Sequence, residues 1–269
     1  MNPVAAELLK YGRELEDSGA AQVGGSFTNN ASADALLKTS PNAFLIGVLF
    51  TQGVPAERAW AGPWELTRRL GTLDLRYLSG HPDEVRAAVQ QPPMLHRFKE
   101  TIPRWICSAA GRLNRDYGGD AAAIWKPGSH VLDVTERLSA FDGIGRKKSV
   151  MAVEILTRHF GVSLVGRECG QVAYDVQVRR VFLRSGLVRT DSLEEVEAAA
   201  ALACPEAPGT LDLPTWLVGR ESCRPLAPLC DRCRLTDVCP RKIELGVLGV
   251  GTRQSAARNT NPESSLGKK

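Results

Sequence analysis

FDGIGRKKSVMAVEIL, residues 141–156, joins two segments with helical spacing of apolar residues through a short glycine turn. The segment before it, HVLDVTERLSAF at 130–141, places its apolar residues on one helix face, and SVMAVEIL after the turn does the same. Gly143 and Gly145 flank Ile144, and glycine suits backbone that needs positive φ or close approach by another molecule. The stretch therefore predicts a helical hairpin closed by a tight turn.

Three cations, Arg146, Lys147 and Lys148, stand at the expected start of the second helix. The amides of residues 143–146 should be uncovered there, and a helix N-terminus attracts anions through its free N–H groups and its dipole. A DNA phosphate is the expected occupant, held without any reading of the base. The alternative that these residues alone leave open is an ordinary helix cap followed by a solvated cationic turn.

Four of the seven cysteines fall close together in CRPLAPLCDRCRLTDVC, with the spacing C-x6-C-x2-C-x5-C. This clustering favours a metal centre over a disulfide framework, and both zinc and a [4Fe-4S] cluster are candidates. Only one C-x2-C knuckle is present, and the wider loops suit a larger object, so we favour the cluster over zinc. The expected ligands are Cys223, Cys230, Cys233 and Cys239.

The composition is that of a globular protein with a mildly basic charge, with 43% hydrophobic residues and a formal net charge of +4. This charge permits a nucleic-acid partner without requiring one. The N-terminus lacks the apolar region of a signal peptide, and the longest apolar run, AFLIGVLF at 43–50, is too short to span a membrane. We therefore expect a cytoplasmic protein without membrane contact.

Helical spacing of apolar residues recurs along almost the whole chain, and no pair of alternating strands is visible. We therefore predict an all-α fold. Three stretches, 17–33, 161–173 and 249–269, are expected to be irregular, and the last of them to be a disordered tail. The predicted helices cover residues 3–16, 42–52, 56–70, 83–90, 96–117, 131–141, 146–160, 175–186, 192–204 and 212–220.

The G-I-G hairpin, an aspartate downstream and the cysteine loop, in this order, resemble the helix-hairpin-helix DNA glycosylases, and among them the endonuclease III family. The resemblance implies two helical domains on either side of a DNA-binding cleft. A six-helix barrel domain would span 34–165, and an iron–sulfur domain would combine 1–33 with 166–248. It also implies a nucleoid-associated monomer that carries a [4Fe-4S] cluster and binds double-stranded DNA containing damaged bases or abasic sites.

The family's motifs place its functional residues on this sequence. The family's hairpin reads L-P-G-V-G-R-K, which FDGIGRK at 141–147 matches, so the catalytic lysine maps to Lys147. Its V-D-T-H-V segment resembles YDVQV at 174–178, which maps the catalytic aspartate to Asp175. Its L-L-S-A-Q segment resembles VLFTQ at 48–52, so Gln52 is expected to fill the space left by a flipped base. The expected hairpin contacts with DNA are Gly143, Ile144, Gly145, Arg146 and Lys148.

The resemblance implies a glycosylase with AP lyase activity that removes oxidised pyrimidines through a Schiff base on Lys147 and nicks the strand by β-elimination. Two alternatives within this fold are a glycosylase for mispaired uracil or thymine and a damage-binding relative with weak or no catalysis. A third hypothesis is a zinc-stabilised helical module without a DNA role. From the residues alone, Asp175 is equally a helix N-cap, and Lys147 is equally a surface lysine.

The sequence also departs from the family pattern. Asp142 replaces the hairpin proline, Lys148 follows the mapped lysine in place of threonine, and Gln177 replaces the histidine of the aspartate motif. The connection 161–173 is longer than in the family and borders the expected active site. A second wedge, for the opposite DNA strand, is expected near QPPMLHRF, with Leu95 or His96 as its candidate.

Overall fold

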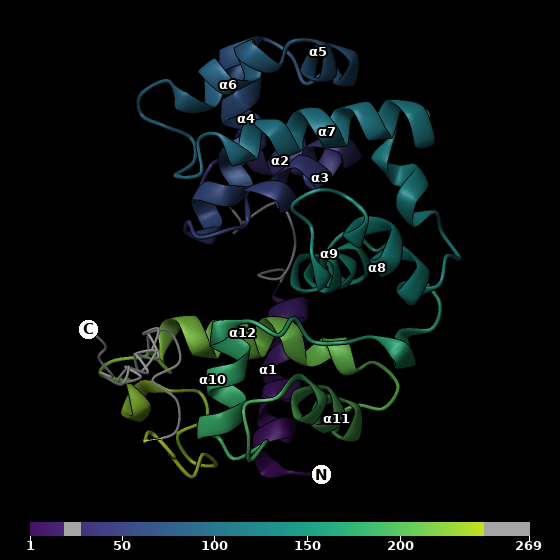
Figure 1. The fold of residues 1–269 in the computed structure, drawn as a ribbon. Helices are drawn as coiled ribbons and strands as arrows, with labels where there is room; N and C mark the ends of the chain where they lie inside the picture. Colours follow the sequence, from purple (N-terminus) through teal and green to yellow (C-terminus); the bar gives the residue numbers. More distant parts are fainter. Residues whose placement is uncertain (19–27, 245–269) are drawn as a thin grey trace, which may run out of the picture.

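The structure, a computed structural model, describes residues 1–18 and 28–244. The secondary structure of these residues is helical, and the only β pairing among them is an isolated bridge between His130 and Val165, so the predicted all-α class is confirmed (Figure 1). None of the described helices is long and apolar enough to cross a membrane. The α-helices are α1 (Pro3–Asp17), α2 (Ala31–Thr39), α3 (Pro41–Phe50), α4 (Ala56–Leu70), α5 (Leu75–Gly80), α6 (Pro82–Gln90), α7 (Thr101–Asp116), α8 (Val131–Ser139), α9 (Arg146–Arg158), α10 (Val176–Arg184), α11 (Leu193–Ala203) and α12 (Asp212–Glu221).

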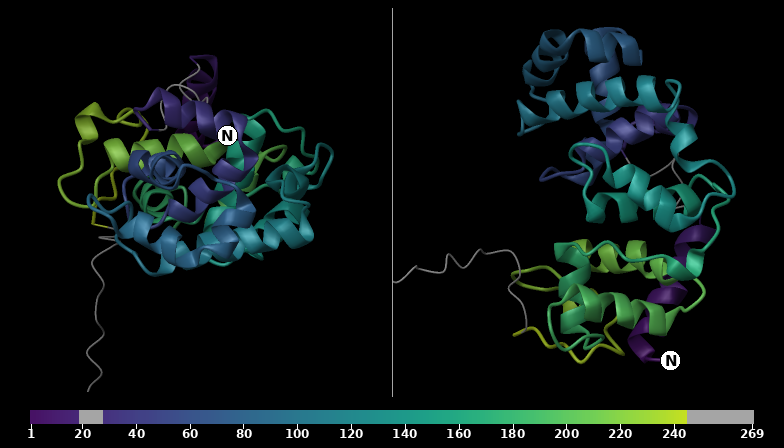
Figure 2. Two further views of the ribbon diagram at one scale, coloured as in Figure 1. Left: turned by 90° about the horizontal axis from the view of Figure 1, so that it is seen from above. Right: turned by 45° about the vertical axis from the view of Figure 1, so that its right-hand side comes forward.

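The described helices form two lobes that lie one above the other (Figure 2). The upper lobe holds α2 to α9 around one hydrophobic cluster, whose residues run from Leu37 to Leu164. The lower lobe packs α1 against α10, α11 and α12 around a second cluster, whose residues lie between Val4 and Leu9 and between Val172 and Leu235. We propose these clusters as the cores of the two expected domains, 34–165 and 1–33 plus 166–248, whose borders remain predictions.

Helix α3 is buried on every side, because its sequence PNAFLIGVLF contains almost only apolar residues. Ser40 caps its N-terminus by accepting a hydrogen bond from the amide of Ala43 at 3.1 Å. The helix ends at Phe50 without a glycine cap, and the chain passes directly into Thr51 and Gln52. The burial of α3 therefore fixes the place at which the expected wedge residue leaves the core.

The structure adds two helices that hydrophobic spacing did not predict. Asn30 caps α2, which begins inside the stretch 17–33, so the expectation of an irregular segment was wrong for its last residues. Asp74 caps the six-residue helix α5, which is too short to show a helical repeat. In the remaining irregular stretches, residues 19–27 and the expected disordered tail 249–269 lie outside the described residues.

Candidate functional site

The glycine turn between α8 and α9 has two glycines in different environments. Gly143 has a φ of +82°, and a Cβ placed on it would lie 2.3 Å from the ring of Trp105 on α7. Gly145 has a φ of −86°, and nothing lies within 4 Å of the place where its Cβ would be. The fold itself therefore requires glycine at 143, whereas the space beside Gly145 is open to another molecule.

Fewer side chains and amides of the glycine turn face the solvent than the sequence predicts. The side chain of Ile144 is only 1% exposed, and its amide donates to the carbonyl of Phe141 at 3.0 Å, so neither faces outward. This corrects the expectation that Ile144 contacts DNA. No side chain among the described residues caps α9, whose first turn begins with Arg146 and Lys147. The anion site expected here is therefore confined to Gly145 and the first turn of α9.

The two neighbouring lysines of α9 point to different environments. Lys147 is exposed, whereas Lys148 is 5% exposed and lies inside the upper lobe. The Lys148 ammonium donates to the carbonyl of Leu49 at 2.9 Å and lies 5.3 Å from the ring centroid of Trp105. Burial, reinforced by the charge of Lys147, lowers the pKa of Lys148 to about 8. The expectation that Lys148 contacts DNA is therefore wrong, because its charge is turned into the protein.

Two other hairpin side chains also have protein partners. Arg146 is half exposed and pairs with Glu197 of α11, which links the two lobes. Asp142, which replaces the family's proline, accepts a hydrogen bond from the hydroxyl of Ser108 on α7 at 2.8 Å. The carboxylate of Asp142 is thus held by α7, and Arg146 must exchange a carboxylate partner if it is to bind a phosphate.

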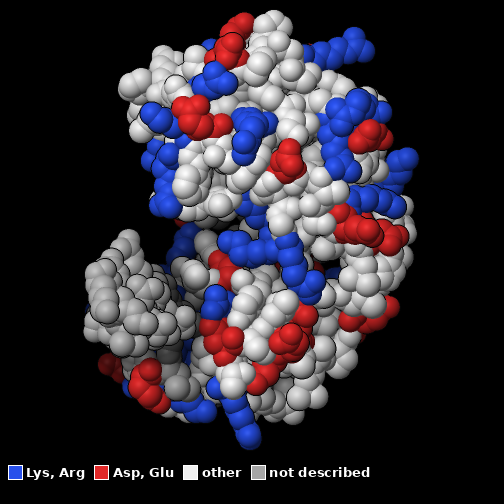
Figure 3. Space-filling model, in the orientation of Figure 1, with Lys and Arg blue, Asp and Glu red and all other residues white. Residues whose placement is uncertain are grey.

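A cavity of about 190 Å³ lies where the hairpin helix faces the lower lobe. Lys147 lines it from α9, and Tyr174 lines it from the segment leading into α10. Basic side chains also gather where the two lobes meet on the face shown in Figure 3, which is hollowed between them. The cavity therefore brings the mapped lysine together with the immediate neighbour of Asp175. Its lining residues are Arg146, Lys147, Val150, Val172, Tyr174 and Leu193.

Asp175 is the N-cap of α10. This is the role that its sequence position predicts when the resemblance to the glycosylases is set aside. One oxygen of its carboxylate accepts from the amides of Gln177 at 2.7 Å and Val178 at 3.1 Å. Because the cap fixes the side chain at the start of α10, Asp175 is rigidly placed beside the cavity. Capping and a catalytic role are compatible, since the bonded oxygen leaves the other one available for a charge that develops nearby.

Tyr174 is held in place by two further contacts that the sequence did not suggest. Its hydroxyl donates to Asp191 at 2.8 Å, and the guanidinium of Arg179 lies 4.7 Å from its ring centroid. Arg179 in turn pairs with the same carboxylate of Asp191. The wall of the cavity next to Asp175 is therefore rigid, and no pattern in the sequence indicated it, because Asp191 follows α10 whereas Tyr174 precedes it.

Gln177, which replaces the family's histidine, has a structural environment. Its side-chain carbonyl accepts from the guanidinium of Arg180, which is 1% exposed. Arg180 also donates to the carbonyl of Gly219 at 2.8 Å, and a Cβ on Gly219 would lie 2.7 Å from that of Gln177. Gln177 therefore joins α10 to α12 and supplies a partner for a buried charge.

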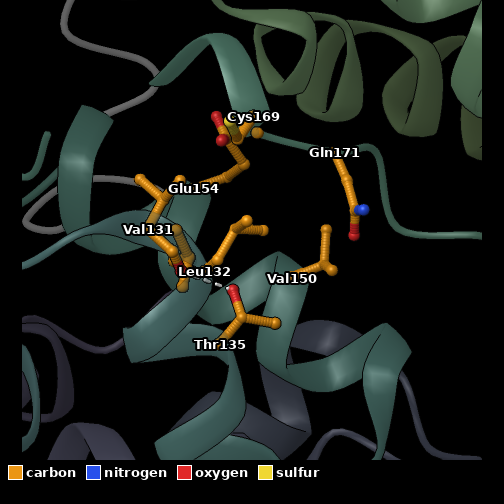
Figure 4. Close-up of a pocket in the computed structure, with 9 residues that line it drawn as sticks. Val131, Leu132, Thr135, Val150, Glu154, Cys169 and Gln171 are labelled. Atoms are coloured by element: carbon orange, nitrogen blue, oxygen red, sulfur yellow. Dashed lines mark hydrogen bonds between the residues drawn. The ribbon is translucent and has the colours of Figure 1, made fainter. Parts of the chain in front are cut away.

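The long connection 161–173 lies largely across the hairpin, and its Val172 lines the cavity beside Lys147. Val165 pairs with His130 at the start of α8, and Cys169 and Gln171 line a small cavity of about 10 Å³ together with α8 and α9. Figure 4 shows Glu154 of α9 beside Cys169 at this cavity. The carboxyl of Glu154 also faces the lower lobe, because a Cβ on Gly209 would lie 2.0 Å from its Oε1.

Two buried carboxyl groups therefore sit near the contact between the lobes. Burial raises the pKa of Glu154 to about 7, against the opposing charges of Arg158 and Arg167, with Glu16 raising it further. Burial raises the pKa of Asp212 to about 8, and its Oδ1 accepts from the amide of Ala173 at 2.7 Å. The charges of Asp175 and Glu154 raise the pKa of Asp212 further, and Arg158 lowers it.

These two groups predict a loss of stability as the pH rises. Both pKa values are higher in the folded state than the ordinary 4.5 and 3.8, so the stabilisation is full below about pH 4 and is lost as the pH rises through about 7 and 8. We expect Tm to fall by roughly 5 °C between pH 5 and pH 9. Calorimetry of Asp212→Asn should show a flatter dependence, because Asn does not titrate while it keeps the acceptor for the Ala173 amide. An unchanged slope in this variant would contradict the assignment.

Gln52 is exposed just beyond the C-terminus of α3, as a wedge must be. The expected second wedge was wrong, because Leu95 is 7% exposed and His96 is 0% exposed. Their segment has apolar and aromatic residues that resemble a wedge in sequence, but the structure places them in the core of the upper lobe. Met94 and Arg97 are the exposed residues on either side of them.

The four clustered cysteines lie together at the edge of the lower lobe. Three of them pack against its hydrophobic cluster, and all four are half-buried. Burial raises the pKa of Cys233 and of Cys239, and charges on the neighbouring cysteine thiols raise both further. Backbone amides point at two of the sulfurs, from Leu235 to Cys233 at 3.5 Å and from Arg241 to Cys239 at 3.4 Å.

The environment of these thiols fits an anionic sulfur centre. Arg184, which is 2% exposed, points its guanidinium at the sulfur of Cys223 at 3.9 Å and binds the carbonyl of Arg224 at 2.7 Å. Hydrogen bonds to sulfur are a usual feature around iron–sulfur ligands. Among the described residues, no group of three or more His, Cys, Asp or Glu is arranged to hold a single metal ion.

Comparison with known proteins agrees with this arrangement. No family model matches the sequence. Endonuclease III of Thermotoga maritima is 33% identical over 115 residues, which are 42% of this chain and 49% of that protein, so the chain spans about half the length of this relative. A trapped endonuclease III–DNA covalent intermediate matches with a TM-score of 0.57 and 20% identity, over 78% of this chain and 92% of that one.

A thermostable thymine-DNA glycosylase has a similar structure, with a TM-score of 0.59 and 13% identity over 89% of this chain and 94% of that one. At these identities the structural matches establish the fold, and they extend over both lobes of the described chain. The chain therefore shares the all-helical, two-lobed fold of these DNA glycosylases.

Proposed function

We propose that the chain is a base-excision DNA glycosylase with AP lyase activity. The observation that carries this proposal is the inter-lobe cavity, which Lys147 lines from α9 and Tyr174 lines from the segment that ends at Asp175. A primary amine that faces the cavity, with a carboxylate one residue from its wall, supplies the two groups needed to displace a base from its sugar. Fold similarity to endonuclease III supports the same activity.

Phosphate binding at the hairpin would hold the damaged strand. Gly145 leaves open space at the N-terminus of α9, and Arg146 and Lys147 add positive charge there. These groups grip the backbone without reading the base, so recognition of the lesion falls to the cavity and the wedge. Extrusion of the base costs a few kcal/mol, and Gln52 would fill the gap left in the duplex.

The chemical step uses the neutral amine of Lys147. Its Nζ attacks C1′, the glycosidic C1′–N bond breaks, and the base leaves with the electron pair and acquires a proton. Asp175, fixed by its capping bonds, stabilises the positive charge that develops on the sugar. The bound amine then loses a proton, and the C1′–O4′ bond of the sugar breaks with a proton passing to O4′, which gives the Schiff base. Loss of the proton at C2′ then permits elimination of the 3′ phosphate, which nicks the strand.

Oxidised pyrimidines are the proposed substrate class, with mispaired uracil or thymine as the second candidate. The second candidate is favoured by the altered wall of the cavity, where Tyr174 stands in place of the first residue of the family's V-D-T-H-V segment. Borohydride trapping on three duplexes, with an abasic site, an oxidised pyrimidine or a uracil–guanine mispair, tests both. The duplex that is trapped identifies the lesion class. Tight binding without any trapping would instead support a damage-binding relative without catalysis.

We also propose that Cys223, Cys230, Cys233 and Cys239 ligate a [4Fe-4S] cluster. The spacing of the cysteines suits a larger group than a single ion, and amides and a guanidinium face the sulfurs. When bound, the cluster would close the loop of residues 223–239 that follows α12 and so contribute to folding.

Removal of one ligand tests the cluster directly. Cys230→Ser is expected to abolish the visible absorption of anaerobically purified protein and to lower Tm by roughly 5 °C or more, because the loop loses its cross-link. Cys107→Ser, which changes a cysteine of the upper lobe, is the matched control and should keep the absorption. Colourless wild-type protein that contains stoichiometric zinc would contradict the proposal.

A further inference from the structure

We propose that Lys148 is a positioning residue, which holds the Gln52 turn in the geometry that fills the duplex after a base has been extruded. This inference rests on the proposed function, since it concerns the base-extrusion step of that activity. Its starting point is the direct contact of the Lys148 ammonium with the carbonyl of Leu49, in the last turn of α3. The hairpin helix and the wedge turn are thereby joined by one side chain.

The C-terminus of α3 must satisfy its last carbonyls without the usual glycine cap. The carbonyl of Val48 accepts from the amide of Thr51 at 3.2 Å and from its hydroxyl at 2.7 Å. The carbonyl of Phe50 accepts from the amide of Gln52 at 2.7 Å. The carbonyl of Leu49 between them receives the Lys148 ammonium, so this lysine completes the end of α3.

Burial of the Lys148 ammonium costs free energy unless nearby groups compensate its charge. The groups around it therefore show what this charge is matched to. Lys148 is 5% exposed, and no carboxylate is among its contacts within the described residues. It is stabilised instead by the negative end of the α3 dipole and by the face of Trp105. Its charge is therefore matched to the C-terminus of α3 and not to a solvated surface.

The opposite side of the Gln52 turn is held by the segment 91–98. His96 is fully buried, and its Nδ1 accepts from the amide of Phe98 at 3.0 Å, so the hydrogen of a neutral ring is on Nε2. Burial lowers the pKa of His96, while the carbonyls of Phe50 and Gln52 oppose this shift. The guanidinium of Arg97 lies 3.1 Å from the place of a Cβ on Gly53.

The Gln52 turn is therefore fixed from two directions, by Lys148 of the hairpin helix and by the segment with His96 and Arg97. Lys148 is adjacent in sequence to Lys147. Any displacement of the first turn of α9, where the phosphate and the sugar would bind, is transmitted through Lys148 to the end of α3. This contact keeps Lys147, the proposed nucleophile, and Gln52, the proposed wedge, at a fixed position relative to each other while the base is out of the stack.

A double-mutant cycle tests the coupling of Lys148 to Gln52. Duplexes with 2-aminopurine next to the lesion report extrusion by fluorescence, and the cycle uses Lys148→Met, Gln52→Ala and the double variant. We expect Lys148→Met to lower the extrusion equilibrium roughly tenfold in the wild-type background and less than about twofold in Gln52→Ala, as for coupled residues. Lys148→Arg, which keeps a cation at this carbonyl, should restore most of the loss.

The matched control is Arg137→Met. Arg137 also donates to a backbone carbonyl of the upper lobe, that of Ile124 at 3.1 Å, but it lies on α8 without contact to the Gln52 turn. Arg137→Met should leave extrusion unchanged even where it lowers Tm. If Lys148→Met is unfolded at the assay temperature, Lys148→Leu, which also lacks a donor, replaces it in the same cycle at a lower temperature.

The outcomes separate this inference from the proposed function. Equal losses from Lys148→Met in both backgrounds would mean that Lys148 does not act through Gln52 and would overturn the inference, although trapping by the wild-type protein would still support the glycosylase. Absence of both trapping and extrusion in the wild-type protein would overturn the proposed function itself.

Discussion

Replacement of Lys147 by alanine is expected to abolish covalent trapping and to slow the nicking of an abasic duplex by about a thousandfold or more, as loss of a covalent nucleophile does. The structure gives the reason. Lys147 is the exposed lysine of the hairpin helix, and it lines the cavity beside Asp175, whereas its neighbour Lys148 is turned into the upper lobe. No other lysine lines this cavity.

Affinity for DNA should change much less in this variant. Loss of one cation removes about one phosphate contact, so Lys147→Ala should bind an abasic duplex within roughly tenfold of the wild type and with a slightly smaller salt dependence. Lys10→Ala, at an exposed lysine of α1 paired with Glu7, is the matched control and should keep both trapping and binding. A trapped adduct in Lys147→Ala would assign the nucleophile to another amine.

The local features of this site could be predicted from the sequence because they depend on neighbours in the chain. The glycine turn, the capping position of Asp175 and the grouping of four cysteines each require only a few consecutive residues. Helix periodicity was likewise sufficient for the long helices, whereas the short α5 could not be seen by this signal. The mapped pair, Lys147 and Asp175, remains a prediction until trapping tests it.

What the sequence could not reveal depends on tertiary contacts. Lys148 continues the cationic run of the hairpin, and only the packing of α9 on α3 shows that its charge is used inside the lobe. Ile144 belongs to the turn, yet its side chain completes the upper core. His96 lies in a segment that resembles a wedge, but the fold buries it. The burial of the Asp212 carboxylate could not be predicted from the sequence, because its partner, Ala173, is 39 residues away in the chain.

Alanine substitutions at the two glycines of the hairpin are expected to have different effects. Gly143→Ala should lower the stability of the protein, whereas Gly145→Ala should lower its affinity for DNA. Gly143→Ala is expected to lower the free energy of unfolding by about 2–4 kcal/mol, because a residue with a Cβ is strained at a φ of +82° and would collide with the Trp105 ring. Gly145→Ala should change it by less than about 0.5 kcal/mol, since its backbone is extended and no atom lies near its Cβ. Urea unfolding of both variants measures these changes.

The affinity for DNA should be weakened by Gly145→Ala, the variant whose stability is expected to change little. A Cβ at residue 145 would occupy the space in which a phosphate approaches the first amides of α9, so Gly145→Ala should weaken the affinity for an abasic duplex by roughly tenfold while the protein stays folded. Titrations at two salt concentrations should show that one phosphate contact has been lost. Wild-type affinity in Gly145→Ala would place the phosphate elsewhere and support the alternative of a helix cap with a solvated cationic turn. Undiminished stability in Gly143→Ala would mean that Trp105 moves aside, and Lys148 would then lose the ring that now covers its ammonium.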